Sequence, residues 1–165
     1  AEEMQFWTKA EFEQFITAVQ DKPASYTAFM TMYYTGMRVG ELCALTPADV
    51  DLKNNTIAIS KTFQRINGKD VVWAPKTPKS KRKIKMPQFL CAELQEYMTF
   101  CYKIQPNERL FPVTKSFLHR MMEKGCRQQN LDKIRFPHIN VGSEAITPLL
   151  QAIKAVQNQP EAPQQ

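Results

Sequence analysis

The chain has 165 residues and a formal net charge of +6 at pH 7, and 43 % of its residues are hydrophobic. This is the composition of one ordinary globular domain, which excludes a disordered, collagen-like or membrane-embedded chain. The acidic, mixed N-terminus excludes a recognisable secretory signal, so we expect a cytoplasmic protein with no membrane partner.

Two amphipathic segments open the chain. Thr8-Lys9-Ala10-Glu11 has the form of a capping box, and the apolar spacing after it predicts a helix over residues 8–21. Asp21-Lys22-Pro23 should break this helix. A second, mostly apolar helix that contains Phe29 and Tyr33 should then run to Gly36, and a short third helix should cover residues 38–45.

The period then changes to that of strands. Ile57 and Ile59 alternate with smaller residues, and Asn67-Gly68 is a strong signal for a tight hairpin between residues 63–66 and 71–73. A further strand is predicted over residues 81–86, with Lys83 and Lys85 on the face opposite Ile84 and Met86. These segments predict a small three-stranded antiparallel sheet that carries a basic hairpin.

Helical spacing returns in the second half, with helices predicted from Pro87 to about residue 105 and over residues 115–129. After His138 the character changes: residues 139–156 form a divergent tail with a short amphipathic helix that begins at Thr147-Pro148, and residues 157–165 should be disordered. The predicted fold class is therefore α+β, mainly helical, with one small antiparallel sheet.

The positive charge is concentrated in one part of the chain. Residues 53–85 contain ten basic and one acidic side chain, whereas residues 1–52 contain three basic and eight acidic ones. Six of the ten positions from 76 to 85 are basic. Such a block suggests a polyanionic partner, because lysine and arginine contacts with phosphates release counterions. A solvated basic hairpin or a nuclear-localisation patch would have the same composition.

Other motifs are sparse. The four cysteines form no CxxC pair and the two histidines complete no metal-ligand spacing, so we expect reduced thiols and no metal site. Arg38 and Glu41 are three residues apart on the predicted third helix, so the carboxylate could orient the guanidinium as a phosphate clamp; an ordinary surface ion pair has the same spacing. His138 by itself is typical of a satisfied polar residue at the end of an element.

Three segments, in this order, resemble the signatures of one enzyme family. They are Thr35-Gly36-Met37-Arg38-Val39-Gly40-Glu41-Leu42, then Pro75-Lys76-Thr77 with Ser80, Arg82, Ile84 and Pro87, and finally Phe136-Pro137-His138. They resemble the first signature box, the catalytic-lysine hairpin and the start of the second box of the tyrosine recombinases, the phage-type integrases. The resemblance covers about residues 6–138.

The resemblance implies a catalytic domain that acts on double-stranded DNA, without a metal, a cofactor or a small-molecule substrate. In this family a tyrosine hydroxyl attacks a phosphodiester, forms a 3′-phosphotyrosyl link and releases a 5′-hydroxyl. By resemblance Arg38 would bind the phosphate, Glu41 would support the site, Lys76 would act as general acid and His138 would assist proton transfer. The DNA-binding surface would include five side chains of the basic run: Lys76, Lys79, Lys81, Arg82 and Lys83.

The chain departs from the family pattern after His138. The family has an arginine three residues later, where this sequence has Val141, and no tyrosine follows His138. We therefore expect residues 1–138 to be a partial catalytic domain that is inactive by itself. The first hypothesis is a DNA-binding fragment of a site-specific recombinase; the alternative is a non-catalytic DNA-binding or protein-interaction module that regulates an integrase.

Two protein partners are compatible with these hypotheses, a full-length integrase or a second copy of this chain. In a third reading, the missing nucleophile comes from a tyrosine of another chain.

Overall fold

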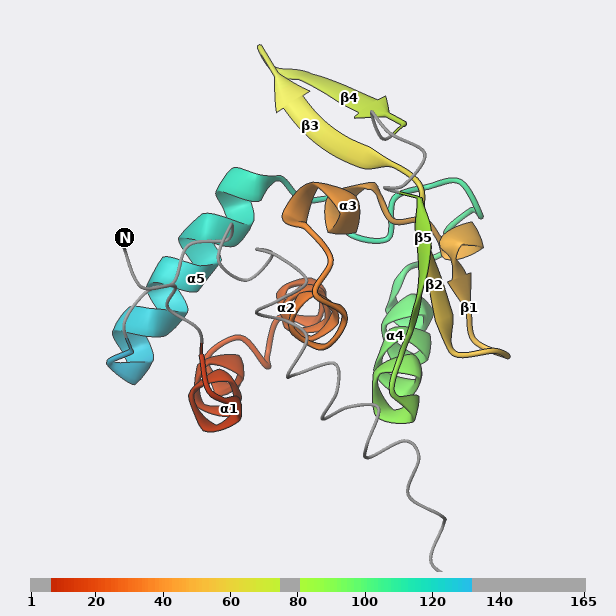
Figure 1. Ribbon diagram of the computed structural model, residues 1–165. Coiled ribbons are helices and arrows are strands. Elements are labelled where there is room, and N and C mark those ends of the chain that lie inside the picture. The colour runs from red at the N-terminus through yellow and green to blue at the C-terminus, as the bar shows by residue number, and fades with distance from the viewer. Residues whose placement is uncertain (1–6, 75–80, 132–165) are drawn as a thin grey trace, which may run out of the picture.

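The computed structural model describes residues 7–74 and 81–131. Within these residues the fold is α+β, as predicted: a group of helices packs beside short antiparallel strands (Figure 1). The helical elements are α1 (Lys9–Thr17), α2 (Pro23–Thr35), α3 (Val39–Ala44), the 3₁₀ turn η1 (Pro47–Asp49), α4 (Gln88–Phe100) and α5 (Lys115–Gln129). The strands are β1 (Val50–Asp51), β2 (Thr56–Ile59), β3 (Thr62–Ile66), β4 (Lys69–Trp73) and β5 (Arg82–Lys85).

The ends of the first two helices follow local sequence signals. The Thr8 hydroxyl accepts a hydrogen bond from the Glu11 backbone N–H at 3.1 Å, and the Glu11 carboxylate accepts one from the Thr8 N–H at 3.0 Å, which confirms the capping box. Helix α2 ends at Gly36, whose φ of 68° is in the left-handed region that favours glycine. Helix α1 ends at Thr17, four residues earlier than predicted, and a turn continues the chain to Pro23.

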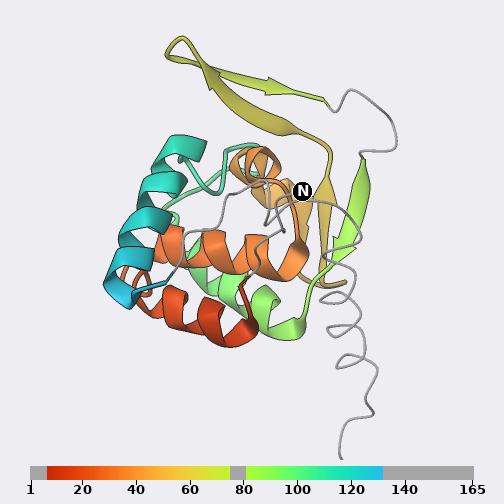
Figure 2. The ribbon, with the colours of Figure 1, turned by 60° about the vertical axis from the view of Figure 1, so that its left-hand side comes forward.

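Helix α2 is buried on most of its surface, between α1, α3 and α4 (Figure 2). Aromatic side chains dominate the core around it, and Phe12, Phe15 and Phe29 are at most 2 % exposed. The buried hydroxyls of α2 are satisfied inside the helix, because Thr31 donates to the Thr27 carbonyl at 2.7 Å and Thr35 donates to the Thr31 carbonyl at 2.6 Å. Helix α2 therefore fixes the position of the Gly36–Arg38 segment that follows it.

The predicted small antiparallel sheet is present, with a different set of strands. Strand order is β1-β2-β5 in a three-stranded sheet, and β3 and β4 form a separate two-stranded sheet. Asn67 and Gly68 have φ values of 51° and 74°, as the predicted tight turn requires. The β3–β4 hairpin extends beyond the helices in both views (Figures 1 and 2), whereas β5 returns to pair with β2.

The second half agrees with the prediction in its helices and differs at one boundary. Pro87 is the N-cap of α4, and α4 ends at Phe100, short of residue 105. Tyr102 was expected on this helix, but it lies in the turn beyond it with its side chain 84 % exposed. No helix within the described residues has the length and apolar character needed to cross a membrane. The predicted tail helix and disordered end lie outside the described residues.

Candidate nucleic-acid interface

The N-terminus of α3 presents Arg38. This residue is the N-cap of the helix, with an extended backbone (φ −71°, ψ 149°) and an exposed side chain. The Glu41 carboxylate accepts a hydrogen bond from the Arg38 backbone N–H at 2.9 Å, which satisfies one of the free amides at the start of the helix. Among the described residues, no carboxylate forms an ion pair with the Arg38 guanidinium. A cation held at its backbone and free at its side chain can bind an external anion.

The predicted contact between the Glu41 carboxylate and the Arg38 guanidinium is wrong. Arg38 is the N-cap of α3, and only its backbone N–H bonds the Glu41 carboxylate, because no ion pair joins these two described side chains. Glu41 instead pairs with Arg82 of β5 through two hydrogen bonds, Nη1 to Oε2 at 2.8 Å and Nη2 to Oε1 at 3.0 Å. The Glu41 side chain is only 9 % exposed and that of Arg82 is 38 % exposed, so this is a bidentate pair between a buried carboxylate and a partly solvated guanidinium.

Strand β5 has the two faces that the sequence predicted. Met86, just beyond it, is buried and Ile84 is half-buried, while Lys81, Lys83 and Lys85 are exposed. Lys83 and Lys85 pair with small residues of β2, Ala58 and Thr56. Within the described part of the chain, none of these three lysines forms an ion pair. The β5 segment is therefore a row of exposed lysines, of which Lys83 interacts electrostatically with Asp51.

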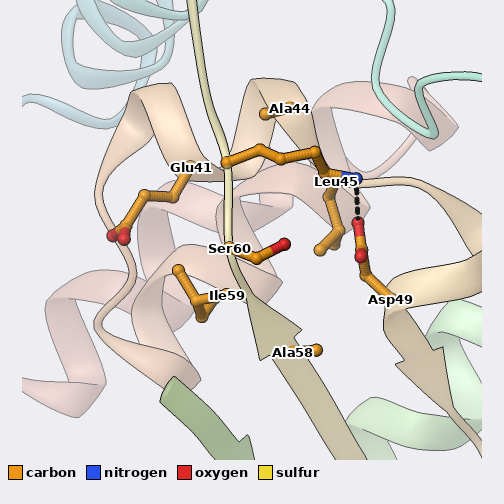
Figure 3. Close-up of a pocket in the computed structure, with 8 residues that line it drawn as sticks. Glu41, Ala44, Leu45, Asp49, Ala58, Ile59 and Ser60 are labelled. Atoms are coloured by element: carbon orange, nitrogen blue, oxygen red, sulfur yellow. Dashed lines mark hydrogen bonds and ion pairs between the residues drawn. The ribbon is translucent and has the colours of Figure 1, made fainter. Parts of the chain in front are cut away.

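A second carboxylate caps the adjoining 3₁₀ turn in the same manner. Asp49 accepts hydrogen bonds from the Thr46 backbone N–H at 3.0 Å and from the Lys61 ammonium group at 2.8 Å. Glu41 and Asp49 lie on opposite sides of a shallow depression crossed by the β2 residues (Figure 3). The depression has essentially no space for even a water-sized molecule, whereas ordinary ligand pockets have volumes of roughly 300–1,000 Å³. The depression is therefore too small for a typical organic ligand.

Arg109 forms hydrogen bonds at the C-terminal end of α3, and the sequence analysis did not identify it as a site residue. Its Nη1 donates to the carbonyls of Cys43 (3.1 Å), Phe111 (3.3 Å) and Val113 (3.0 Å). The guanidinium also lies 3.8 Å from the centre of the Phe63 ring of β3. Its partners are backbone carbonyls and one ring, and no sequence motif indicates such contacts. Arg109 joins α3, β3 and the segment before α5.

The remaining predicted site residues are outside the described part of the chain. Lys76, Lys79 and His138 lie there, whereas Arg38, Glu41, Lys81, Arg82 and Lys83 are described, and the Glu41–Arg82 pair brings them into one region. No group of three or more histidine, cysteine, aspartate or glutamate side chains within residues 7–74 and 81–131 could hold a metal ion. Cys43, Cys91 and Cys126 are buried, and Cys101 is half-buried.

Burial disfavours ionisation of four of the five tyrosines in the described residues. Burial raises the pKa of Tyr33 to about 12, and it also raises those of Tyr26, Tyr34 and Tyr97. A raised pKa disfavours the phenolate that would attack phosphorus. Tyr102 is exposed, in the turn beyond α4.

Comparison with known proteins decides the family. The model of the phage integrase family matches residues 5–148. The chain belongs to the phage integrase family. Its similarity to curated integrases extends over most of its length: it is 27 % identical to the ICEBs1 integrase of Bacillus subtilis (strain 168), over 84 % of this chain and 42 % of that protein. It is 32 % identical to the integrase of Staphylococcus phage L54a, over 77 % of this chain and 42 % of that one.

This integrase-family chain spans less than half the length of these curated relatives. Solved structures share its fold. The Tn1549 transposon integrase in complex with circular intermediate DNA superposes with a TM-score of 0.74 at 24 % identity, over 95 % of this chain and 58 % of that one. The XerA recombinase superposes with a TM-score of 0.69 at 21 % identity, over 95 % of this chain and 54 % of that one. The described elements therefore have the same fold as these integrase and recombinase structures.

Proposed function

We propose that this chain binds double-stranded DNA through the phosphate backbone, as part of the catalytic domain of a site-specific tyrosine recombinase. The observation that carries the proposal is the exposed guanidinium of Arg38, which forms no ion pair within the described residues, together with the exposed lysines of the β5 segment. Rows of lysine and arginine that lack internal carboxylate partners favour phosphates. The Tn1549 integrase, which shares the fold, was solved with DNA.

The proposed roles follow the chemistry of phosphoryl transfer. Arg38 binds the non-bridging oxygens of the phosphate, where negative charge increases during attack on phosphorus. In a site that also contains the nucleophile, Lys76 would protonate the leaving 5′ oxygen, and His138 would assist the transfer of the proton from that nucleophile. Glu41 contacts no DNA in this scheme, because both of its oxygens are bonded within the protein. Lys79, Lys81 and Lys83 hold the DNA backbone nearby.

We also propose that these 165 residues bind DNA without cleaving it. Cleavage by them alone would require one of the five tyrosines that precede His138, and burial disfavours ionisation of four of them. Incubation with a nicked duplex, followed by denaturing electrophoresis, measures any covalent protein–DNA adduct. An adduct that forms with this chain alone would contradict this part of the proposal.

Salt dependence tests the DNA-binding proposal directly. With about four phosphate contacts, affinity for a mixed-sequence duplex should fall about a hundredfold between 50 and 200 mM salt. Replacing both Lys81 and Lys83 by glutamine should reduce the slope of log K against log salt by about two. The matched control replaces Lys9 and Lys103, which are exposed on α1 and beyond α4, with the same change of charge.

Equal losses in both double variants would show non-specific attraction to a cationic protein. Binding that is insensitive to salt would contradict the proposed function. Fluorescence anisotropy with a labelled duplex measures both quantities.

A further inference from the structure

Arg82 belongs to the basic run, but its side chain has a different environment from the lysines on either side of it. Residues alternate between the faces of a strand, so Arg82 faces opposite to Lys81 and Lys83. Its guanidinium forms the two hydrogen bonds to Glu41, and it pairs in register with the buried Ile59 of β2. Arg82 is directed towards α3, whereas the exposed lysines face solvent.

The Glu41 carboxylate connects Arg82 to Arg38. Its Oε1 accepts from the Arg38 backbone N–H at 2.9 Å and from Arg82 Nη2 at 3.0 Å, and its Oε2 accepts from Arg82 Nη1 at 2.8 Å. We propose that Arg82 is a positioning residue, which holds Arg38 in place through Glu41 and does not itself contact DNA. The inference rests on the proposed function, in which Arg38 binds a phosphate.

The physical basis is the shortness of α3. A six-residue helix is not stable by itself, so contacts with the rest of the protein must fix its first turn. The planar guanidinium of Arg82 bonds both oxygens of the Glu41 carboxylate at once. This bidentate contact fixes the carboxylate in the orientation that caps the Arg38 amide. A lysine at position 82 would keep the positive charge but could not form the same bidentate contact. Without this bidentate contact the Glu41 side chain can adopt other rotamers, and the Arg38 backbone amide then loses its hydrogen-bond acceptor.

The chain provides a matched control for this arrangement. Asp49 caps the Thr46 amide and pairs with Lys61, so it has the same place in η1 that Glu41 has in α3. It is 12 % exposed, close to the 9 % of Glu41. Glu41→Gln and Asp49→Asn each raise the net charge by one and replace one accepting oxygen by an NH₂ group, but only Glu41 is bonded to Arg38.

The sign of the effect on DNA affinity is the main test. By charge alone, both Glu41→Gln and Asp49→Asn should bind a mixed-sequence duplex slightly more tightly than wild type. The positioning role instead predicts about tenfold weaker binding for Glu41→Gln only. Arg82→Lys, which leaves the charge unchanged, should weaken binding about threefold or more. Combined with Arg38→Ala, it should cause no further loss, because its effect requires the Arg38 side chain.

Several results would overturn the proposal. Wild-type affinity of Arg82→Lys, or additive losses in the double variant, would identify Arg82 as an independent contact. Equal changes in DNA affinity for Glu41→Gln and Asp49→Asn would show that the effect is due to net charge alone. Thermal melting of each variant shows whether the fold is kept, and Arg82→Lys provides the test if Glu41→Gln does not fold.

A readout without DNA separates this inference from the proposed function. Hydrogen exchange of the Arg38 backbone amide should be faster in Arg82→Lys than in wild type, and unchanged in Lys61→Gln. Unchanged exchange in Arg82→Lys would refute the positioning role even if DNA binding is confirmed. Absence of salt-dependent DNA binding by wild type would refute the proposed function, while faster exchange would still support the link from Arg82 to Arg38.

Discussion

Replacing Gly125 by alanine has two opposite effects on the free energy of unfolding, and their magnitudes can be compared. Gly125 is buried in the middle of α5, where alanine should gain about 1 kcal/mol from helix propensity. A Cβ built there would lie 2.5 Å from Cε2 and 3.0 Å from Cδ2 of Phe15. The Phe15 ring is fully buried, with the Trp7 and Phe29 rings 4.5 and 4.9 Å away between centroids, so it has little room to move. Overpacking of this kind costs about 1–3 kcal/mol.

The clash should therefore cancel or exceed the propensity gain, and we expect Gly125→Ala to destabilise the protein by about 1 kcal/mol. For a chain of this size that lowers Tm by about 2–4 °C. Differential scanning calorimetry measures it, with Phe15→Leu as the partner in a double-mutant cycle. In the Phe15→Leu background the clash is removed, so Gly125→Ala should become neutral or stabilising. A higher Tm for Gly125→Ala in the wild-type background would refute this reasoning.

Two further predictions concern tyrosines. Tyr97 donates a 2.6 Å hydrogen bond to the buried Leu110 carbonyl, so Tyr97→Phe should cost about 1–3 kcal/mol in urea denaturation, and an unchanged midpoint would show that another group satisfies the carbonyl. Burial raises the pKa of Tyr33 from 10.0 to about 12, so its contribution to stability is complete below pH 10 and is lost as the pH rises towards 12. Between pH 10 and pH 12 the free energy of unfolding should fall less in Tyr33→Phe than in wild type. An equal fall in the two proteins would show that other groups cause the loss of stability.

Local signals predicted most of the fold correctly. The capping box at Thr8 and Glu11, the glycine at the end of α2 and the Asn67-Gly68 turn each depend on residues within four positions of one another. Their physical causes, backbone amides that need acceptors and backbone angles that need glycine or asparagine, act over the same short range. These features can therefore be read from the sequence without knowledge of the tertiary structure.

Contacts between distant parts of the chain could not be predicted in the same way. Glu41 and Arg82 are 41 residues apart, and the helical spacing of Arg38 and Glu41 suggested a nearer partner. Arg38 is the N-cap of α3 rather than a residue within the helix, and the Glu41 carboxylate pairs with Arg82 instead of the Arg38 guanidinium. Arg109 donates to backbone carbonyls, which every residue has, so its role leaves no pattern in the sequence. The Asp49–Lys61 pair was missed for a similar reason, because it joins two separate elements.

The separate sheet formed by β3 and β4 has a practical consequence for labelling. Within the described residues these two strands pair only with each other, and β2 pairs with β5 independently of them. A Cβ at Gly68 would have no neighbouring atom within 4 Å. A fluorophore or short epitope inserted at this turn would lie at the end of an arm extending from the body (Figure 2), so it would report on the protein without altering the register that sets Arg82 against Glu41.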